Sequence, residues 1–147
     1  MYNNDKILLE QAYHAIYEND SPFKPATPDD IEDRKRQILR IANQKVQEYI
    51  KNGSVGNLIL MGTSIQSLPR DLKVGGRLNL SFTSIKSLPP GLEVGGNLDL
   101  SYTSIQSLPA DLKVGGKLYL AVASLSRKYT KNEIREMCPG IDGEIYV

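Results

Sequence analysis

Residues 74–93 read VGGRLNLSFTSIKSLPPGLE and residues 94–113 read VGGNLDLSYTSIQSLPADLK, two copies that agree at 13 of 20 positions. An earlier copy, NLILMGTSIQSLPRDLK, covers residues 57–73, and a later one begins VGGKLYLAVASL at Val114 before the pattern breaks. A fixed period is typical of chains in which each repeat stacks on the next, because one repeat alone cannot bury its apolar side. The sequence therefore predicts a solenoid of three full coils and a degenerate fourth.

The apolar positions of each copy predict where the core lies. In the L-x-L segment, alternation with a period of two points both leucines to one side of a short strand. The following isoleucine extends that column, and the leucines beside the prolines close the core from a returning arm that proline keeps extended. In the first copy these positions are Leu58, Leu60, Ile65, Leu68 and Leu72, and the later copies repeat them.

The pattern L-x-L, a small polar residue and I-x-x-L-P-x-x-L resembles the leucine-rich-repeat family. It is similar to the short repeats with Leu-Pro signatures of bacterial and bacteriophage proteins, including secreted effectors that carry a helical hairpin before the repeats. The resemblance covers about half of the chain. It implies noncovalent binding of another protein and raises the hypothesis of a phage-encoded inhibitor of a host protein. The chain has no room for the ubiquitin-ligase domain of some larger effectors, so an effector role is not carried over.

The repeats depart from that family at two places. Thr63, Thr83 and Thr103 stand where such repeats commonly carry asparagine, and we expect them to hydrogen-bond backbone groups of adjacent coils. A Val-Gly-Gly segment recurs at each bend into a strand, where glycine permits positive φ and close stacking of coils. No copy continues into the Lys-Ser/Thr of a phosphate-binding loop. The glycines are therefore interpreted as structural.

Both ends of the chain differ from the repeats, as expected of caps that cover an exposed solenoid core. Residues 5–18, DKILLEQAYHAIYE, predict an amphipathic helix that SPFKPATP breaks. Thr27 and Asp30 form a capping-box pattern before a second helix that runs to Asn52. We expect this helical hairpin to dock on the first repeat. The apolar positions of the second helix are Ile31, Ile38, Ala42, Val46 and Tyr49.

At the other end, Thr130 and Glu133 have capping-box spacing and predict a short helix to about Met137. Residues 143–147, GEIYV, predict a last strand that pairs with the strand around Leu118 and protects its edge. The fold class is thus an α/β solenoid: a short leucine-rich-repeat array with an N-terminal helical hairpin and a C-terminal helix-strand cap. We expect one cooperative unit made of a helical capping segment (1–53), the repeats (54–125) and a C-terminal cap (126–147).

Composition and residue inventory argue against several functions. The net charge of +1 gives no general attraction to nucleic acid or to an anionic membrane, and no apolar run suits a signal peptide or a membrane span. One cysteine, Cys138, and one histidine, His14, supply neither a disulfide framework nor the usual zinc ligands. We therefore expect a cytoplasmic protein with no membrane partner.

Catalysis is not expected, since neither His14 nor Cys138 has neighbours in the sequence that indicate an activated nucleophile. The acids from Asp29 to Asp33 suit the first turn of a helix, where they complement its dipole, better than a metal site. Asp99 is the only acid in its row of repeat positions, so paired carboxylate chemistry has no support. We predict no enzyme activity, no cofactor and no metal.

Binding is expected at the positions that change from copy to copy, because the unchanged ones face the core or form bends. Phe82 and Tyr102 should stand next to one another where consecutive strands end, either as anchors for a partner or as a stacked ladder over the core rim. Ile59 and Met61 are expected to contact the N-terminal helices. The predicted protein-binding residues are Arg77, Asn79, Phe82, Asn97, Asp99, Tyr102, Lys117 and Tyr119.

A second hypothesis places nucleic acid on the basic C-terminal cap, where tyrosines lie among the cations and could stack on bases. The residues concerned are Lys113, Lys117, Arg127, Lys128, Lys131 and Arg135. An ordinary solvated cap explains the same charges, and no nucleic-acid motif accompanies them. A protein partner is the favoured hypothesis, with self-association through a sheet edge as a further alternative.

Overall fold

The computed structural model describes residues 26–147, so the helix predicted at residues 5–18, with its His14, lies outside the described residues. The chain divides into two units, Met1–Arg34 and Lys35–Val147. The described part of the first unit is the beginning of helix α2. The second unit contains the rest of that helix and all of the repeats.

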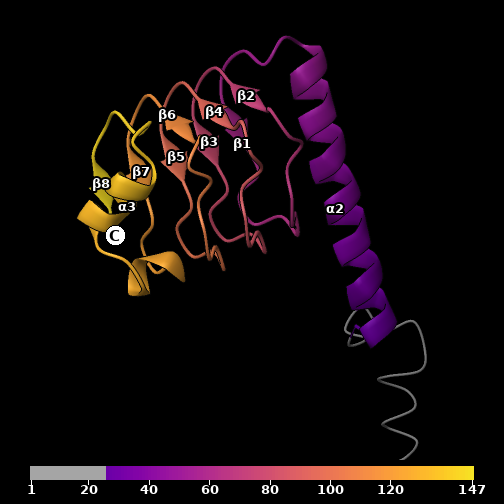
Figure 1. The fold of residues 1–147 in the computed structure, drawn as a ribbon. Coiled ribbons are helices and arrows are strands. Elements are labelled where there is room, and N and C mark those ends of the chain that lie inside the picture. The colour runs from indigo at the N-terminus through magenta and orange to yellow at the C-terminus, as the bar shows by residue number, and fades with distance from the viewer. Residues whose placement is uncertain (1–25) are drawn as a thin grey trace, which may run out of the picture. The chain divides into compact units, whose positions relative to one another are not determined.

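Helix α2 spans Pro28–Lys51, close to the range that the sequence predicts (Figure 1). The Thr27 amide donates to Asp30 Oδ2 at 2.8 Å, and the Asp30 amide donates to Thr27 Oγ1 at 3.2 Å. This reciprocal pair is the predicted capping box. Proline at the first helical position removes an amide that would have no partner within the helix.

The C-terminal turns of α2 pack against the first coil. Ala42 and Val46 are buried, and Tyr49 packs against the same core. The Tyr49 hydroxyl accepts a hydrogen bond from the Gly75 amide at 3.1 Å and lies 2.8 Å from the Gly56 carbonyl oxygen, to which it can donate. One phenol thus joins α2 to two coils.

The predicted apolar face of α2 is buried over only part of its length. Ile31 and Ile38 are 45% and 41% exposed, although they share the helical spacing of Ala42 and Val46. The described contacts of α2 with the coils come from its later turns, such as the bond of 2.8 Å from Lys45 Nζ to the Ile59 carbonyl. The apolar positions of α2 are therefore buried at Ala42 and Val46 and exposed at Ile31 and Ile38.

Consecutive coils pair their first strands in parallel, with Leu58 opposite Leu78, Leu78 opposite Leu98 and Leu98 opposite Leu118. The repeat period therefore becomes the register of a five-stranded sheet, in a parallel β-solenoid of about three turns (Figure 1). Its strands, in spatial order, are β1 (Leu58–Ile59), β3 (Leu78–Asn79), β5 (Leu98–Asp99), β7 (Leu118–Tyr119) and β8 (Ile145–Tyr146).

A second, three-stranded parallel sheet lies where the sequence analysis placed only a bend. Its strands are β2 (Lys73–Val74), β4 (Glu93–Val94) and β6 (Lys113–Val114). The valine of each Val-Gly-Gly segment is buried. The two glycines of the segment give no alternating pattern, so the sequence predicts only a bend, yet one inward valine is enough to continue the core.

The glycines of Val-Gly-Gly allow close packing of the coils, as expected. They do not adopt positive φ, so that part of the expectation is wrong. None of them is among the described glycines with positive φ. A Cβ atom built on Gly115 would lie 2.6 Å from the Gly95 carbonyl oxygen, and one on Gly75 would lie 2.9 Å from that of Ser54. Since real Cβ atoms do not approach backbone so closely, these positions require glycine wherever one coil crosses the next.

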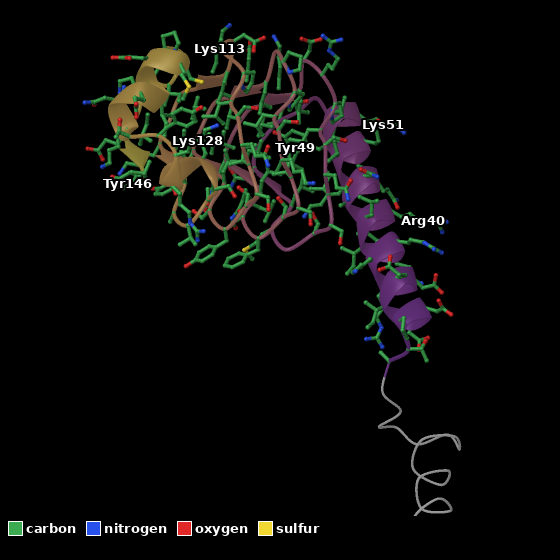
Figure 2. The ribbon with its side chains drawn as sticks, turned by 60° about the horizontal axis from the view of Figure 1, so that its bottom comes forward. Arg40, Tyr49, Lys51, Lys113, Lys128 and Tyr146 are labelled. Atoms are coloured by element: carbon green, nitrogen blue, oxygen red, sulfur yellow. The ribbon has the colours of Figure 1, made fainter. Side chains whose placement is uncertain are left out.

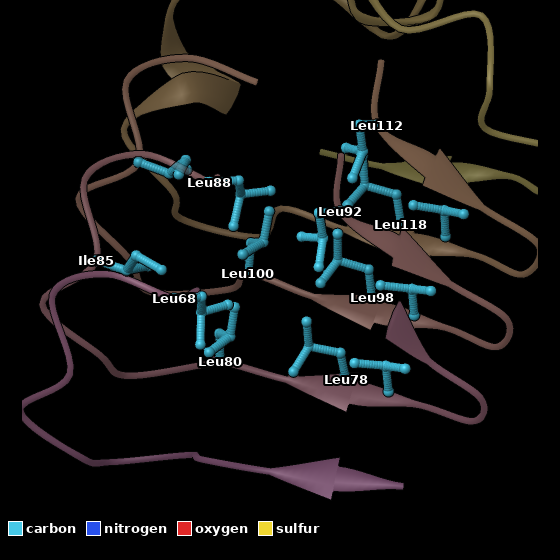
Figure 3. Close-up of a cluster of buried hydrophobic side chains, with 14 of the residues drawn as sticks. Leu68, Leu78, Leu80, Ile85, Leu88, Leu92, Leu98, Leu100, Leu112 and Leu118 are labelled. Atoms are coloured by element: carbon cyan, nitrogen blue, oxygen red, sulfur yellow. The ribbon is translucent and has the colours of Figure 1, made fainter. Parts of the chain in front are cut away.

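The core is a column of leucine and isoleucine side chains between the two sheets and the returning arms (Figure 3). Every position that the repeat pattern assigned to it is buried, except Leu108, which is half-buried and packs against the column. The returning arms contribute Leu68, Leu88, Leu92 and Leu112. The predicted core is therefore confirmed.

The threonine ladder expected between coils does not form. Thr83 Oγ1 donates to the Leu80 carbonyl oxygen at 2.7 Å, and Thr103 Oγ1 donates to that of Leu100 at 2.6 Å. Each of these bonds stays within its own coil. The threonines therefore close the turn that follows each strand.

The C-terminal segment forms a 3₁₀ turn (Leu125–Arg127), helix α3 (Lys131–Met137) and strand β8. Thr130 and Glu133 form the predicted capping box. Strand β8 pairs in parallel with β7, placing Ile145 opposite Leu118. Within residues 26–147, no helix is both long enough and apolar enough to cross a membrane.

The close crossing of coils predicts that Gly115→Ala is strongly destabilising. Its Cβ would meet backbone that cannot move aside, at a cost of about 3 kcal/mol in the free energy of unfolding. Gly62→Ala is the matched control, because Gly62 has φ +70° and no atom within 4 Å of an added Cβ. That control should lose only about 1 kcal/mol from its backbone conformation. If urea denaturation shows the same loss of unfolding free energy for both variants, this explanation of the glycines is wrong.

Candidate functional site

Phe82 and Tyr102 occupy the same position in consecutive coils and lie side by side, as the register predicts. The Phe82 amide donates to the Ser101 carbonyl oxygen at 3.1 Å. The two rings stack with centroids 4.5 Å apart and planes 8° apart. Both remain in solvent, 58% and 51% exposed. The coils therefore present a flat aromatic pair on the surface of the solenoid.

The aromatic pair has exposed apolar neighbours in the first and last coils. Val122 continues the row after Tyr102, and Met61 precedes Gly62, the equivalent of Phe82 in the first coil. Met61 is more than half exposed, so the described helix α2 does not bury it, and the first of the helices expected to contact Met61 lies outside the described residues. We call Met61, Phe82, Tyr102 and Val122 the apolar ridge.

The backbone under the ridge adopts a conformation that large residues avoid. Phe82, Tyr102 and Val122 have φ of 57°, 56° and 56°, and Gly62 has 70° at the same position. A left-handed conformation costs a residue with a Cβ about 1–2 kcal/mol, and a β-branched valine there is rare. The coil geometry thus requires positive φ, and three coils carry a large apolar side chain there in spite of the cost.

Ring stacking does not account for the whole row. An aromatic pair contributes about 0.5–1.5 kcal/mol beyond its buried area, which would offset part of the cost at Phe82 and Tyr102. Val122 has no ring, and its side chain is half exposed. Ring stacking therefore does not explain the left-handed valine of the last coil.

Asn79 and Asn97, two of the predicted contact residues, use their side-chain oxygens in hydrogen bonds within the solenoid. Asn79 is only 8% exposed, and its Oδ1 accepts from the amide and the hydroxyl of Ser81 at 2.9 and 2.7 Å. Asn97 Oδ1 accepts from the Lys117 amide at 2.9 Å and so links two coils. Asn79 lies on the same face of the coil as Ser81, as period-two alternation predicts, but its side chain is buried and its Oδ1 is already bonded to Ser81. Asn79 is therefore removed from the candidate surface.

Arg77 and Asp99 are paired with one another across coils. Arg77 Nη2 lies 2.9 Å from Asp99 Oδ2, and the side chains are 43% and 15% exposed. Asp99 Oδ1 also accepts from the Ser101 amide at 3.1 Å. A partner would meet this pair as a neutral polar patch, because each charge already has a counterpart.

Tyr119 and Lys117, also predicted contacts, gather around a residue that the sequence analysis did not select, Tyr146. The rings of Tyr119 and Tyr146 stack at 5.1 Å. Lys117 Nζ lies 3.2 Å from the Tyr146 hydroxyl, and the hydrogen bond between them raises the pKa of Lys117. Lys131 Nζ lies 5.8 Å from the centre of the same ring. The signal for Tyr146 was present, since the predicted pairing of residues 143–147 places it beside Tyr119.

The structure does not gather the six cations of the nucleic-acid hypothesis into one patch. Lys113 belongs to the second sheet, where its Nζ lies 3.0 Å from Glu93 Oε1, and this bond is the main cause that lowers the pKa of Glu93. Lys128 lies over the Tyr129 ring at 5.3 Å. Figure 2 shows Lys113, Lys128 and Tyr146 at separate places on the last coils. Arg127 is exposed beside Lys128 in the 3₁₀ turn.

The chemistry at Cys138 does not favour a nucleophile. Its thiol is buried and donates to the Pro109 carbonyl oxygen at 3.3 Å. Burial raises the pKa of Cys138, and the nearby charge of Asp111 adds to the effect. A raised pKa lowers the fraction of reactive thiolate at neutral pH. Within residues 26–147, no cluster of His, Cys, Asp and Glu is suited to hold a metal ion.

Comparison with known proteins gives no matching family model, no similar curated protein and no similar solved structure. The chain's own residues therefore carry the functional argument. The described solenoid offers the apolar ridge and the tyrosine-lysine group at Tyr146 as exposed features with binding chemistry.

The backbone cost at the ridge predicts that Phe82→Gly changes stability little. Relief of the left-handed conformation, about 1 kcal/mol, offsets the loss of a ring contact of similar size. The free energy of unfolding, measured in urea, should stay within about 1 kcal/mol of the original. Leu80→Ala, two residues away in the core, is the contrasting variant and should lose about 3 kcal/mol. A similar loss in both would mean that Phe82 has a structural role.

Proposed function

We propose that this chain is a noncatalytic protein-binding module and that its solenoid is a short leucine-rich-repeat array of the Leu-Pro type. The L-x-L strands at 20-residue spacing and the S-L-P-x-x-L returning arms support the repeat assignment. The left-handed backbone beneath exposed Phe82, Tyr102 and Val122 carries the functional proposal. Residues kept in such a conformation against its cost cluster at functional sites.

The ridge has the chemistry of an interface centre. Aromatic side chains and methionine are enriched where proteins bind one another, and a few such anchors supply most of the binding energy. Phe82 and Tyr102 are already stacked and fixed by their coils, so they lose little conformational entropy when a partner covers them. The favoured partner surface is an apolar segment that lies across consecutive coils.

The dimensions of the ridge constrain the mode of binding. Neighbouring strands lie about 4.8 Å apart, so the row from Gly62 to Val122 spans about 14 Å. That length accommodates a short extended segment or one face of a helix, and a stable complex needs further contacts around it. An inhibitor that occludes a surface of a host protein, the activity that the family resemblance suggested, would work in this way.

Nucleic-acid binding through the C-terminal cap is the less supported function. Strong backbone binding needs several cations aligned along one path. Here Lys113 is paired with Glu93, and the Arg135 guanidinium is held by the carbonyl oxygens of Ile141 and Gly143. The experiment below includes nuclease so that the two functions give different results.

The proposal predicts that a double variant of the ridge loses the partner without unfolding. Tagged protein is used to capture partners from a bacterial lysate, in parallel with and without nuclease. Bound proteins are quantified by mass spectrometry and bound nucleic acid by absorbance. Phe82→Gly with Tyr102→Gly should reduce the recovery of a specific partner at least about tenfold, because such anchors contribute 2 kcal/mol or more.

Lys86→Ala with Gln106→Ala is the matched control. These residues are exposed in the same two coils but lie outside the ridge. The control should recover the partner within about twofold of the original protein. Unchanged recovery with the ridge variant would contradict the proposed site. Capture of nuclease-sensitive nucleic acid, with no specific protein, would contradict the proposed function.

A further inference from the structure

A surface cavity opens between α3 and β8, on the C-terminal cap. Its volume is about 300 Å³, and its lining consists of Lys131, Asn132, Arg135, Glu144, Ile145 and Tyr146. The lining thus combines tyrosine and isoleucine from the last strand with amide, ammonium and guanidinium groups from the helix. These groups are donors of hydrogen bonds, which suits an acceptor such as a carboxylate.

Positive charge is in excess around this cavity. Arg135 donates to the carbonyl oxygens of Ile141 and Gly143 at 3.3 and 2.8 Å, and these neutral acceptors hold the guanidinium in place without cancelling its charge. Lys131 and Arg135 form none of the ion pairs found in the described part of the chain. Lys117 adds a third cation at the Tyr146 hydroxyl.

The carboxylate in the cavity lining, Glu144, is already engaged. The Tyr146 hydroxyl donates to Glu144 Oε2. This hydrogen bond, followed by the charge of Lys117 and then that of Lys131, lowers the pKa of Glu144. Lys117, Lys131 and Arg135 together carry three positive charges, and Glu144 carries one negative charge. The net charge of this group is therefore positive, which favours the binding of a further anion.

The cavity lies close to the apolar ridge. The Tyr146 ring stacks on Tyr119, and Tyr119 precedes Val122 by three residues in the same coil. Three residues span at most about 11 Å of chain. One extended peptide of about five residues is therefore long enough to contact both the end of the ridge and the cavity.

We propose that Lys117, Lys131, Arg135 and Tyr146 form a subsite for an acidic side chain of the protein segment that covers the apolar ridge. The inference rests on the proposed function and adds the chemistry of the partner: apolar residues for the ridge, followed by aspartate or glutamate at the cap. A carboxylate side chain is favoured over a nucleic-acid backbone, because one side chain can enter the compact cavity, whereas phosphates lie along a continuous backbone and are bound by several aligned cations.

The test is a titration of the full chain with acetylated tetraglutamate, followed by NMR of backbone amides. Tetraglutamate should shift the signals of residues 131–132 and 144–147 and bind more weakly as salt is added. Lys117→Gln with Lys131→Gln should weaken this binding about fivefold, as expected for the loss of two exposed charge pairs. Lys131→Gln alone should weaken it about twofold, which keeps the test valid if the double variant folds poorly.

Lys128→Gln is the matched control, because Lys128 also lies over a tyrosine ring but outside the cavity. It should change the affinity less than twofold. Two results would overturn the subsite. One is the absence of shifts with tetraglutamate, and the other is an affinity of the Lys117 and Lys131 variants equal to that of the original protein. Tighter binding of tetrathymidylate at the same residues would overturn it in favour of nucleic acid.

The probe separates this proposal from the proposed function. Tetraglutamate has no apolar side chain for the ridge, so its binding does not depend on Phe82 or Tyr102. If the ridge variant loses its protein partner while tetraglutamate fails to bind, the function holds and the subsite fails. If tetraglutamate binds and no protein is captured through the ridge, the cap binds anions but the proposed function fails.

Discussion

Close contact between the backbones of successive coils at Val-Gly-Gly is the constraint on which the solenoid depends. A Cβ on Gly96 would lie 2.9 Å from the Gly76 carbonyl carbon, so neither coil can carry a side chain there. With the backbones this close, equivalent residues stack directly, and the leucines of each L-x-L strand meet those of the next coil. The repeat period, the core and the order of the surface rows follow from that stacking.

The same stacking separates the residues that hold the frame from those that are available to a partner. Asn79, Asn97 and the turn threonines use their polar atoms in hydrogen bonds to the chain itself. Phe82 and Tyr102 use their rings only against one another and leave half of their surface in solvent. Substitutions in the ridge can therefore change what the module binds while the frame stays intact.

Much of the frame could be predicted because it depends on short-range patterns. The repeat period gave the parallel register, and the capping boxes at Thr27 and Thr130 gave the starts of two helices. The second sheet was missed because each of its strands contributes a single inward valine, too little for a periodic signal. The left-handed conformation at Phe82 was missed because only the three-dimensional turn, and no residue preference, requires it.

The candidate site was predicted less completely, because it depends on contacts between distant residues. Phe82 and Tyr102 follow from the register, but Asn79 is buried and bonded to Ser81 and so is not available to a partner. Tyr146 joins Lys117 only through the pairing of the last strand. A pattern with a period of two describes directions along one strand and cannot show which side chains meet across coils.

The most direct measurement of the binding surface is hydrogen exchange, read by mass spectrometry on the protein alone and in its captured complex. We predict slower exchange at residues 81–83, 101–103 and 144–147 in the complex, because the partner covers the apolar ridge and the cap. Residues 73–75 and 93–95 of the second sheet should exchange at the same rate in both samples. Slower exchange confined to the second sheet, or to α2, would contradict the central claim that the ridge is the binding site.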